Sequence, residues 1–499
     1  GSSHRPAGPR QGRIPECKAR DSSHRPAGPP RGPIAERESP AMQHEASPVS
    51  DPLSLAAAAR EAPRAVALIC DGRTYTFAEL AQRAQARAGA LQPRPGRPVA
   101  LDGSNTLDTV VTLYALLEAR APVLLLHPKL TPAERAAEIE ATERAATALP
   151  ADAAAILYTS GTTGRARGAV LTRSALVASA QASAANLGWQ DDDRWLAAMP
   201  IARVGGLSIL TRSLIARRTV VLAAGFDVQA LPRLVKAQRV TLLSVVPTML
   251  ALLLDAHPQW TPPPHLRAVL LGGAAASPRL LAQAAARRLP IVVTYGCTET
   301  CSQVAATPYE HRFDAARHGA GRRLPGAELR LRNARIEVRG PMLMAGYLGE
   351  PPLAPDAWFD TGDLGTRDAD GNLHVLARQG DLVISGGENV YPAEVERVLE
   401  DCPGIAAAAV FGVPDEVWGE TVAAALVADG TAPTDAALDA HLRAQLAPYK
   451  RPRTICYLPA LPQTAGGKLD RSALHRAAAP LRPLYTTPQP ASSPPIDGG

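Results

Sequence analysis

The stretch Tyr158-Thr-Ser-Gly-Thr-Thr-Gly-Arg-Ala-Arg-Gly168 lies between two short apolar runs, residues 153–157 and 169–171. This order predicts a strand, a polar turn and a second strand. Its glycines let the backbone wrap closely around an anion, while its hydroxyl groups and its two arginines supply donors and positive charge. No Gly-Lys-Ser/Thr closes the stretch, so it is not a Walker A loop. It predicts a polyphosphate-binding loop, with a Gly/Thr-rich surface turn as the alternative.

Composition and charge narrow the class of protein. The chain has 499 residues and a formal net charge of +6, and residues 1–41 hold eight Lys/Arg against four Asp/Glu. The charge left for the other residues does not indicate a nucleic-acid surface. No apolar run approaches the roughly 18 residues that a membrane span requires. Six scattered cysteines without metal-ligand spacing indicate reduced thiols, so we expect a cytoplasmic protein of two to four domains.

The two ends of the chain differ from its middle. Residues 2–9 are repeated at 22–29 in a segment rich in Pro, Gly, Ser and Arg, and the first methionine is Met42. Such a composition buries too little apolar surface to fold. We therefore expect a disordered extension over residues 1–51, a natural start at Met42, and a disordered Pro/Ser/Thr tail over 479–499.

From about residue 52 the sequence alternates between helical and strand patterns. Helices are predicted over residues 53–62, 77–91, 107–120, 173–187 and 228–238, with a further helix starting at Gly206. Strands are predicted over residues 65–70, 98–101, 122–126, 195–200, 219–222, 242–246, 269–271 and 291–293. This order predicts mostly parallel sheets covered by helices, with ligands at the carboxyl ends of the strands. Short strands at 328–331, 335–339 and 373–376 predict a small antiparallel barrel or sheet. A compact α/β segment follows over residues 381–478.

Four further motifs follow the central loop in order. They are Tyr295-Gly-Cys-Thr-Glu-Thr300, Trp358-Phe-Asp-Thr-Gly-Asp-Leu-Gly365, Ser385-Gly-Gly-Glu-Asn-Val-Tyr-Pro-Ala-Glu-Val-Glu396 and Thr464-Ala-Gly-Gly-Lys-Leu-Asp-Arg471. Together with the loop, over about residues 52–475, they resemble the acyl-adenylate-forming superfamily of acyl-CoA ligases, luciferases and adenylation domains. Within it, Tyr295–Gln303 and Gly205-Gly-Leu-Ser-Ile-Leu-Thr-Arg212 are most similar to the o-succinylbenzoate–CoA ligase family of menaquinone biosynthesis.

The resemblance implies a large adenylation domain over residues 52–380, made of stacked helix-covered sheets plus the small antiparallel barrel. A small mobile α+β domain over 381–478 completes the implied fold. The implied reaction joins a carboxylic acid to ATP with loss of pyrophosphate, after which the thiol of coenzyme A takes the acyl group. The partners are therefore a small-molecule acid, ATP, Mg²⁺ and coenzyme A, and a homo-oligomer is compatible with the sequence.

Phosphate and metal contacts are implied at two places. Thr298 would contact the α-phosphate and Glu299 would hold Mg²⁺, although a lone Thr-Glu pair is more often a solvated loop. Positive charge and backbone donors are what such a phosphate transition state requires. The remaining phosphate contacts are implied for the loop residues Thr159, Ser160, Gly161, Thr162, Thr163, Gly164 and Arg167.

The nucleoside is assigned to two other motifs. Asp363 would accept both ribose hydroxyls, because a carboxylate has two acceptor oxygens, and Arg378 would assist it. A turn aspartate with a nearby ion pair is the alternative for Asp363. The walls of the adenine slot are implied to be Gly272, Gly273, Ala274, Tyr295 and Gly296.

The C-terminal motifs carry the second half of the implied chemistry. Lys468 resembles the family lysine that reaches the substrate carboxylate and the α-phosphate, and only five of the 53 basic residues of the chain are lysines. Asp381 matches the hinge about which the small domain rotates. That rotation would bring Ser385, Gly386 and Gly387 to coenzyme A.

The resemblance also implies which residues select the acid. Arg212 would bind the free benzoate carboxylate through two parallel bonds, with a helix-surface arginine as the alternative. Gly206 and Ser302 would line the same pocket. Arg203 stands where most relatives carry a histidine that aligns the acid, and Ala166-Arg167 replaces the usual Pro-Lys. These departures leave open an aryl- or medium-chain acyl-CoA ligase, a stand-alone adenylation domain loading a carrier protein, or a non-catalytic nucleotide-binding relative.

Overall fold

The computed structural model describes residues 1, 51–160, 166–385, 388–415, 418–463, 469–478 and 481–484. The chain divides into two units, Gly1–Val49 and Ser50–Gly499, and every element below belongs to the second. Within the described ranges, no helix has both the length and the apolar character that a membrane crossing needs. Residues 161–165 of the central motif lie outside these ranges.

The largest sheet contains the expected parallel strands. Its order is β13-β12-β11-β10-β9-β7-β8-β1-β2, in which the six strands from β11 to β1 are parallel and the outer strands are antiparallel. The strands are β1 (Val66–Cys70), β2 (Arg73–Thr76), β7 (Arg194–Ala197), β8 (Thr219–Leu222), β9 (Leu242–Val245), β10 (Ala268–Leu271), β11 (Ile291–Cys297), β12 (Ser302–Ala306) and β13 (Arg322–Arg323). The apolar residues of the parallel strands β1, β7, β8, β9 and β10 are almost all buried, as expected for strands covered on both faces.

A second sheet carries the central motif. Its order is β16-β6-β5-β4-β3, formed by β3 (Val99–Asp102), β4 (Val123–Leu126), β5 (Ala153–Ser160), β6 (Ala166–Thr172) and β16 (Gly346–Tyr347). Strands β5 and β6 pair antiparallel from Ala153–Thr172 to Ser160–Ala166. The predicted strand, turn and strand around the loop are therefore confirmed for both strands.

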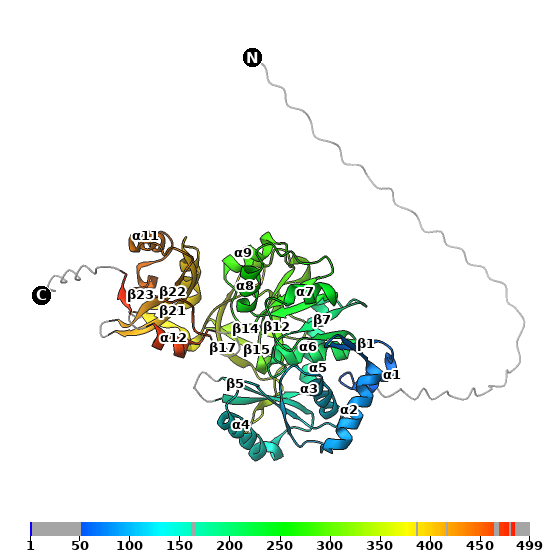
Figure 1. Cartoon of the computed structure of the whole chain (residues 1–499). Coiled ribbons are helices and arrows are strands. Elements are labelled where there is room, and N and C mark those ends of the chain that lie inside the picture. The colour runs from blue at the N-terminus through cyan, green and yellow to red at the C-terminus, as the bar shows by residue number, and fades with distance from the viewer. Residues whose placement is uncertain are drawn as a thin grey trace, which may run out of the picture. The chain divides into compact units, whose positions relative to one another are not determined.

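Nine helices of the described chain cover these sheets (Figure 1). They are α1 (Leu55–Glu61), α2 (Phe77–Leu91), α3 (Leu107–Glu118), α4 (Pro132–Ala145), α5 (Arg173–Leu187), α6 (Val204–Ala216), α7 (Leu231–Ala237), α8 (Pro247–Ala256) and α9 (Pro278–Ala286). Helices α4, α8 and α9 were not predicted from the sequence. Each begins with a proline in its first turn, where the missing N–H costs nothing. Helices α5 and α6 pack side by side.

The third sheet is antiparallel, as predicted for this region. Its order is β14-β15-β17-β18, formed by β14 (Glu328–Arg332), β15 (Arg335–Arg339), β17 (Phe359–Arg367) and β18 (Leu373–Arg378). Strands β14 and β18 are the two ends of this order, so the unit is an open sheet and not a closed barrel. Asn333 and Ala334 both have positive φ (52° and 64°) in the turn between β14 and β15. Such a two-residue turn matches the twist of a hairpin.

The C-terminal part contains a sheet of mixed direction and three helices. Sheet order is β20-β19-β22-β23-β24, and β21 also pairs with β22. The elements are β19 (Val383–Ser385), β20 (Glu388–Val390), α10 (Pro392–Glu400), β21 (Ile405–Asp415), β22 (Gly419–Ala428), α11 (Asp435–Gln445), β23 (Thr454–Tyr457), α12 (Arg471–Ala477) and β24 (Arg482–Pro483). Figure 1 shows β21, β22, β23 and α11 grouped together. Two apolar clusters draw their members from this part alone.

The two segments predicted to be disordered, residues 1–51 and 479–499, each include residues that make defined contacts in the structure. Arg482–Pro483 form β24 against β23, Leu484 is buried, and Arg482 forms an ion pair with Asp435 at 2.6 Å, so ordered structure passes residue 478. At the N-terminal end, Asp51 forms an ion pair with Arg173, in which Oδ2 lies 2.6 Å from Nη2. Composition misses these residues because a few long-range contacts decide their order.

Candidate functional site

Strands β11 and β17 bring Tyr295 and Asp363 together. Tyr295 Oη donates to Asp363 Oδ2 at 2.8 Å, and Asp363 N donates to Thr361 Oγ1 at 3.2 Å. Thr361 Oγ1 in turn donates to the Ile336 carbonyl at 2.9 Å. Burial, with Asp363 as the next cause, raises the pKa of Tyr295 well above its ordinary value, so the phenol stays a donor. This network fixes the direction of the carboxylate that the sequence assigned to ribose.

Arg378 lies beside the same carboxylate. Its Nε is 3.4 Å from Asp363 Oδ1, and the two residues are directly paired across β17 and β18. Register therefore explains why a residue 15 positions away faces the aspartate. Asp363 lies within β17 and not in a turn, although it has the nearby ion pair that the turn-aspartate alternative also expected.

The residues assigned to the adenine slot leave the large sheet at one edge. Strands β10 and β11 pair as far as Leu271–Val293, so the turn 272–274 and Tyr295 emerge next to each other. A Cβ atom at Gly272 would overlap Thr294 Oγ1, and Gly273 has φ +83°. Both glycines are thus required by the turn itself. Gly296 is similarly restricted, because a Cβ atom there would overlap the Ser302 carbonyl.

Thr298 and Glu299 lie in a short 3₁₀ helix, η2 (Thr298–Thr300), directly after β11. Thr300 holds this turn, because its Oγ1 accepts from Cys297 N at 2.9 Å and donates to the Ser302 carbonyl at 2.7 Å. Glu299 is only 8 % exposed. Its Oε1 accepts a hydrogen bond of 2.8 Å from Tyr347 Oη.

The Glu299 carboxylate fits the implied Mg²⁺. This ion takes oxygen ligands and is commonly held by one or two carboxylates plus substrate phosphates and water. Among the described residues, no group of three or more His, Cys, Asp or Glu forms a protein-only metal site. A single buried carboxylate that keeps one oxygen outside the Tyr347 bond is therefore the appropriate donor for a cation that arrives with a nucleotide.

The central hairpin places Thr159 opposite Arg167, and Thr159 Oγ1 donates to the Arg167 carbonyl at 3.4 Å. Ser160 ends β5. The loop residues Gly161, Thr162, Thr163 and Gly164 lie outside the described residues, so their assignment to the phosphates stays a prediction.

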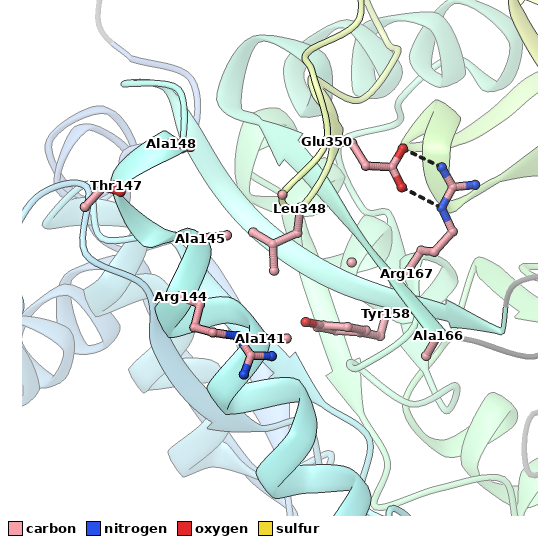
Figure 2. Close-up of a pocket in the computed structure, with 12 residues that line it drawn as sticks. Ala141, Arg144, Ala145, Thr147, Ala148, Tyr158, Ala166, Arg167, Leu348 and Glu350 are labelled. Carbon is pink, nitrogen blue, oxygen red and sulfur yellow. Dashed lines mark hydrogen bonds and ion pairs between the residues drawn. The ribbon is translucent and has the colours of Figure 1, made fainter.

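A cavity of about 470 Å³ lies beside this hairpin (Figure 2). Its lining comes from the end of α4, from Tyr158 and the start of β6, and from residues 348–350. It contains Arg167 and Glu350 but none of Arg212, Glu299, Tyr295 or Asp363. The cavity therefore borders the base of the loop and is not the predicted acid pocket.

Arg212 is a buried cation on α6. The residue is only 3 % exposed, and its Nη2 donates to Ser179 Oγ over a long distance of 3.4 Å. Its Nε is buried without a hydrogen-bond partner among the described residues. Burial lowers the pKa of Arg212 to about 10, so the guanidinium is still charged at neutral pH. The helix-surface alternative is wrong.

Two neighbours of Arg212 come from other elements. They are Ser179 on α5 and Cys301, and Ser179 Oγ donates to the Cys301 carbonyl at 2.7 Å. The predicted substrate residue Ser302 follows Cys301 at the start of β12. Residue 302 has φ +98°, an unusual value for serine. Gly206, the third predicted substrate residue, lies at the start of α6, where a Cβ atom would overlap the Pro200 carbonyl. Close packing accounts for that glycine without a ligand.

Arg203 belongs to a separate cluster of charges. It is the N-cap residue of α6, and its Nε is buried without a partner among the described residues. Burial raises the pKa of Glu138 to about 7, and Arg203 opposes this shift. Burial and then Arg203 lower the pKa of His127. The residue that replaces the expected histidine therefore lies near one carboxyl group and one imidazole.

The C-terminal assignments are described in part. Asp381 lies in η5 (Gln379–Asp381), and its Oδ2 is 2.8 Å from Arg471 Nε. Ser385 ends β19 and is buried. Gly386, Gly387 and Lys468 lie outside the described residues, so their roles stay predictions.

Several residues around the site were missed from the sequence. Asn105 donates to the carbonyls of Met199 and Ala223 and accepts from Ile201 N, which holds the segment before Arg203. The clearest missed residue is Tyr347, because Gly346-Tyr347 forms a two-residue strand with no periodic signal. The one feature of the sequence that could have indicated this residue is a tyrosine directly after a glycine.

Comparisons with known proteins agree with this geometry. The AMP-binding enzyme family matches residues 55–148 and 135–348, and the AMP-binding enzyme C-terminal domain matches residues 394–468. The chain belongs to the AMP-binding enzyme family. The predicted resemblance to the acyl-adenylate-forming superfamily and the predicted α/β fold with a small C-terminal domain are thereby confirmed.

Individual members of the AMP-binding enzyme family are similar to this chain over most of its length. The 2-succinylbenzoate–CoA ligase of Bacillus licheniformis is 37 % identical over 466 residues, covering 83 % of this chain and 97 % of that protein. Two solved structures of o-succinylbenzoate CoA synthetase from Bacillus subtilis cover 84 % of this chain. One holds the acyl-adenylate intermediate (33 % identity, TM-score 0.76, 97 % of that chain). The other holds ATP and magnesium (32 % identity, TM-score 0.75, 98 % of that chain).

Proposed function

We propose that this protein is an ATP-dependent acid–CoA ligase that works through an acyl-adenylate, and that its acid is 2-succinylbenzoate. The products would be 2-succinylbenzoyl-CoA, AMP and pyrophosphate. The similarity to ligases and solved structures of that name supports the proposal. At 37 % identity, however, the acid has to be argued from the residues of this chain.

The buried Arg212 carries the choice of acid. A guanidinium out of contact with water is costly unless an anion or a full set of acceptors compensates it. Among the described residues, Ser179 Oγ is the acceptor that Arg212 has, at 3.4 Å, and its Nε has none. 2-Succinylbenzoate carries two carboxylates, of which one is activated and the other stays free. The free carboxylate supplies the missing anion through a two-bond contact.

Roles follow for the nucleotide site. Asp363, held by Tyr295 at 2.8 Å, accepts the ribose hydroxyls, and Arg378 limits the excess of negative charge there. Gly272, Gly273 and Ala274 border the base, while the central loop and Arg167 bind the outer phosphates. Thr298 donates to the α-phosphate. Glu299 is the ligand for Mg²⁺, which supplies charge neutralisation on the phosphates when it is bound.

The two half-reactions use different residues of the C-terminal part. Lys468 neutralises charge between the acid and the α-phosphate during adenylation. Rotation at Asp381 then exchanges Lys468 for the Ser385–Gly387 segment, which admits the pantetheine arm of coenzyme A. Hinge rotation of a small domain is an established way to run two steps at one site.

Three alternatives differ in the acid, in the acceptor or in having no reaction at all. Arg203, buried near Glu138 in place of a histidine, favours an acid of different shape, such as an aryl or medium-chain acid. Loading of a separate carrier protein would keep the adenylation step and change the acceptor. A non-catalytic nucleotide-binding protein would need no acid at all, and it would leave the buried charge of Arg212 without a purpose.

The test is ATP–pyrophosphate exchange with a panel of acids, followed by addition of coenzyme A. We expect strong exchange with 2-succinylbenzoate and its CoA thioester as the product. R212A should lower kcat/KM for this acid by about 100-fold, the order expected for a lost buried charge pair, while a mono-acid should lose much less. R60A, at an exposed position of α1, is the control. Exchange only with other acids would overturn the proposal that 2-succinylbenzoate is the substrate. Failure to form the thioester would overturn the proposal that coenzyme A is the acceptor.

A further inference from the structure

Glu299 is held from two sides by one short segment, residues 344–347. The Met344 amide donates to the Glu299 carbonyl at 2.8 Å, and Tyr347 Oη donates to Glu299 Oε1 at 2.8 Å. Tyr347 lies in β16, which pairs antiparallel with β6 through Gly346–Val170 and Tyr347–Ala169. The strand that leaves the central loop is therefore the support for the residue that orients Glu299.

Arg167 covers the ring of this tyrosine. Its guanidinium carbon lies 3.4 Å from the centre of the Tyr347 ring. Its Nε and Nη2 donate to Glu350 Oε1 and Oε2 at 3.1 and 2.8 Å, the two parallel bonds drawn in Figure 2. The Leu348 amide also donates to the Gly168 carbonyl at 2.7 Å, which fixes the two segments side by side. The chain of contacts runs from Glu350 through Arg167 and Tyr347 to Glu299.

This arrangement gives a reason for arginine at position 167. A planar guanidinium can stack its face on an aromatic ring and at the same time bond a carboxylate through two N–H groups of one edge. A lysine ammonium is a point charge with no plane and cannot make both contacts in this way. Arg167 and Glu350 therefore form a matched pair, and the departure from the usual lysine is compensated within the same surface.

A single phenol proton has a defined effect on Glu299. The Cys297 thiol also interacts with the Glu299 carboxylate, and the Tyr347 bond is made to its Oε1. The Tyr347 bond selects one rotation of a carboxylate that, at 8 % exposure, has little water to orient it. An oriented carboxylate binds a cation more tightly than a rotating one, because the ordering cost is already met.

We propose that Tyr347 is a positioning residue that orients Glu299 for the divalent cation bound with ATP, and that Arg167, fixed by Glu350, holds the Tyr347 ring in place. The inference rests on the proposed function for the presence of ATP and its cation, and it is independent of which acid is used. It assigns Arg167 a role through its side-chain contacts in addition to its positive charge near the phosphates.

The first test measures binding without turnover. ATP affinity is determined by calorimetry, with no acid present, in excess Mg²⁺ and again in EDTA. Y347F should weaken ATP binding in Mg²⁺ by about tenfold, the order of one charge-assisted hydrogen bond, and should leave binding in EDTA within about twofold. Equal weakening in both conditions, or none in Mg²⁺, would overturn the proposal.

A double-mutant cycle separates positioning from structural support. In the E299Q background, which removes the cation ligand, Y347F should have little further effect on ATP binding in Mg²⁺. Undiminished loss in that background would show that Tyr347 acts elsewhere. Y75F is the matched control, because Tyr75 also lies under an arginine, 5.2 Å from Arg83, and is remote from Glu299. It should leave both affinities unchanged.

The stack and the ion pair are tested by R167K and E350Q. R167K keeps the charge and loses both contacts, so it should show the Mg²⁺-specific weakening of Y347F in part. E350Q should shift the Mg²⁺ dependence in the same direction and by less. If R167K weakens ATP equally with and without Mg²⁺, Arg167 acts only as a phosphate cation and this part of the proposal fails. A wild-type protein that binds no Mg²⁺–ATP would overturn the proposed function itself.

Discussion

Arg471 Nε lies 2.8 Å from Asp381 Oδ2, so the first residue of α12 forms an ion pair with the proposed hinge residue. The same guanidinium donates to the Val410 carbonyl at 2.8 Å and lies 3.5 Å from Glu396 Oε1. Arg471 follows Lys468 by three positions in the sequence. One side chain therefore joins the proposed hinge residue to the start of α12.

The first prediction concerns this connection. R471A should slow the overall reaction by about tenfold and should affect adenylation and thioester formation unequally, because the hinge loses a contact that favours one orientation. R471K should recover part of the loss. Pyrophosphate exchange and single-turnover thioester formation report the two steps separately. R476A, at an exposed position of the same helix, is the control. Equal losses with a lowered unfolding midpoint would show a purely structural role.

A second prediction concerns the Tyr295–Asp363 bond. Y295F removes the donor at 2.8 Å and so removes one of the contacts that set the direction of the carboxylate, while Arg378 stays beside it. We expect KM for ATP to rise by about fivefold, within the range of one hydrogen bond to a charged group. Discrimination against 2′-deoxy-ATP should shrink, because the carboxylate no longer meets both hydroxyls in a fixed direction. Steady-state kinetics with both nucleotides measure this. Unchanged discrimination would argue that Asp363 does not contact the ribose.

Much of this fold follows from local sequence. Helix α2 was predicted over its full observed range, because Thr76 and Glu79 form a capping box at its start. Strands β8 and β15 were also predicted with their observed bounds, since each is a short run between turn residues. Such elements are specified within a few residues of their own ends.

The missed features depend on distant pairing. β16 has two residues and exists only because β6, far earlier in the chain, offers an edge. Arg212 could be placed on a helix from the sequence, whereas its burial depends on α5 packing against α6. The contact of Arg167 with Tyr347 joins two segments about 180 residues apart, which no spacing rule detects.

A third prediction concerns pH. Burial raises the pKa of Glu138 to about 7 from an ordinary 4.5. The folded state therefore keeps a proton that the unfolded chain releases between these values. The free energy of unfolding should fall as the pH rises from about 5 to about 7, by about 1–2 kcal/mol for this partly buried group. E138Q should remove this part of the pH dependence.

Thermal unfolding between pH 5 and pH 8 measures the effect. E140Q is the matched control, because Glu140 is an exposed residue of the same helix that pairs with Arg144. It should keep the slope of the native protein. An E138Q variant with the native slope would show that Glu138 titrates normally, and the charge cluster around Arg203 would then need another carboxyl group.

The fourth prediction concerns the buried ion pair between Asp193 and Arg267. Arg267 Nε and Nη2 donate to Asp193 at 2.8 and 2.5 Å, and Thr241 Oγ1 and the Gln190 amide donate to the same carboxylate at 2.7 and 2.8 Å. Asp193 is 1 % exposed. D193N leaves Arg267 without its counter-charge and should cost about 3–5 kcal/mol of unfolding free energy.

Urea unfolding provides this free energy, and D191N is the control two residues away. Asp191 pairs with Arg218 at 2.7 Å but is fully exposed, so its loss should cost less than about 1 kcal/mol. The fraction of D193N that stays folded should retain ATP–pyrophosphate exchange. Asp193 directly precedes β7 and Arg267 directly precedes β10, so the pair lies at the end of the sheet opposite the nucleotide turns. Similar losses for the two variants would show that burial does not strengthen the Asp193 pair.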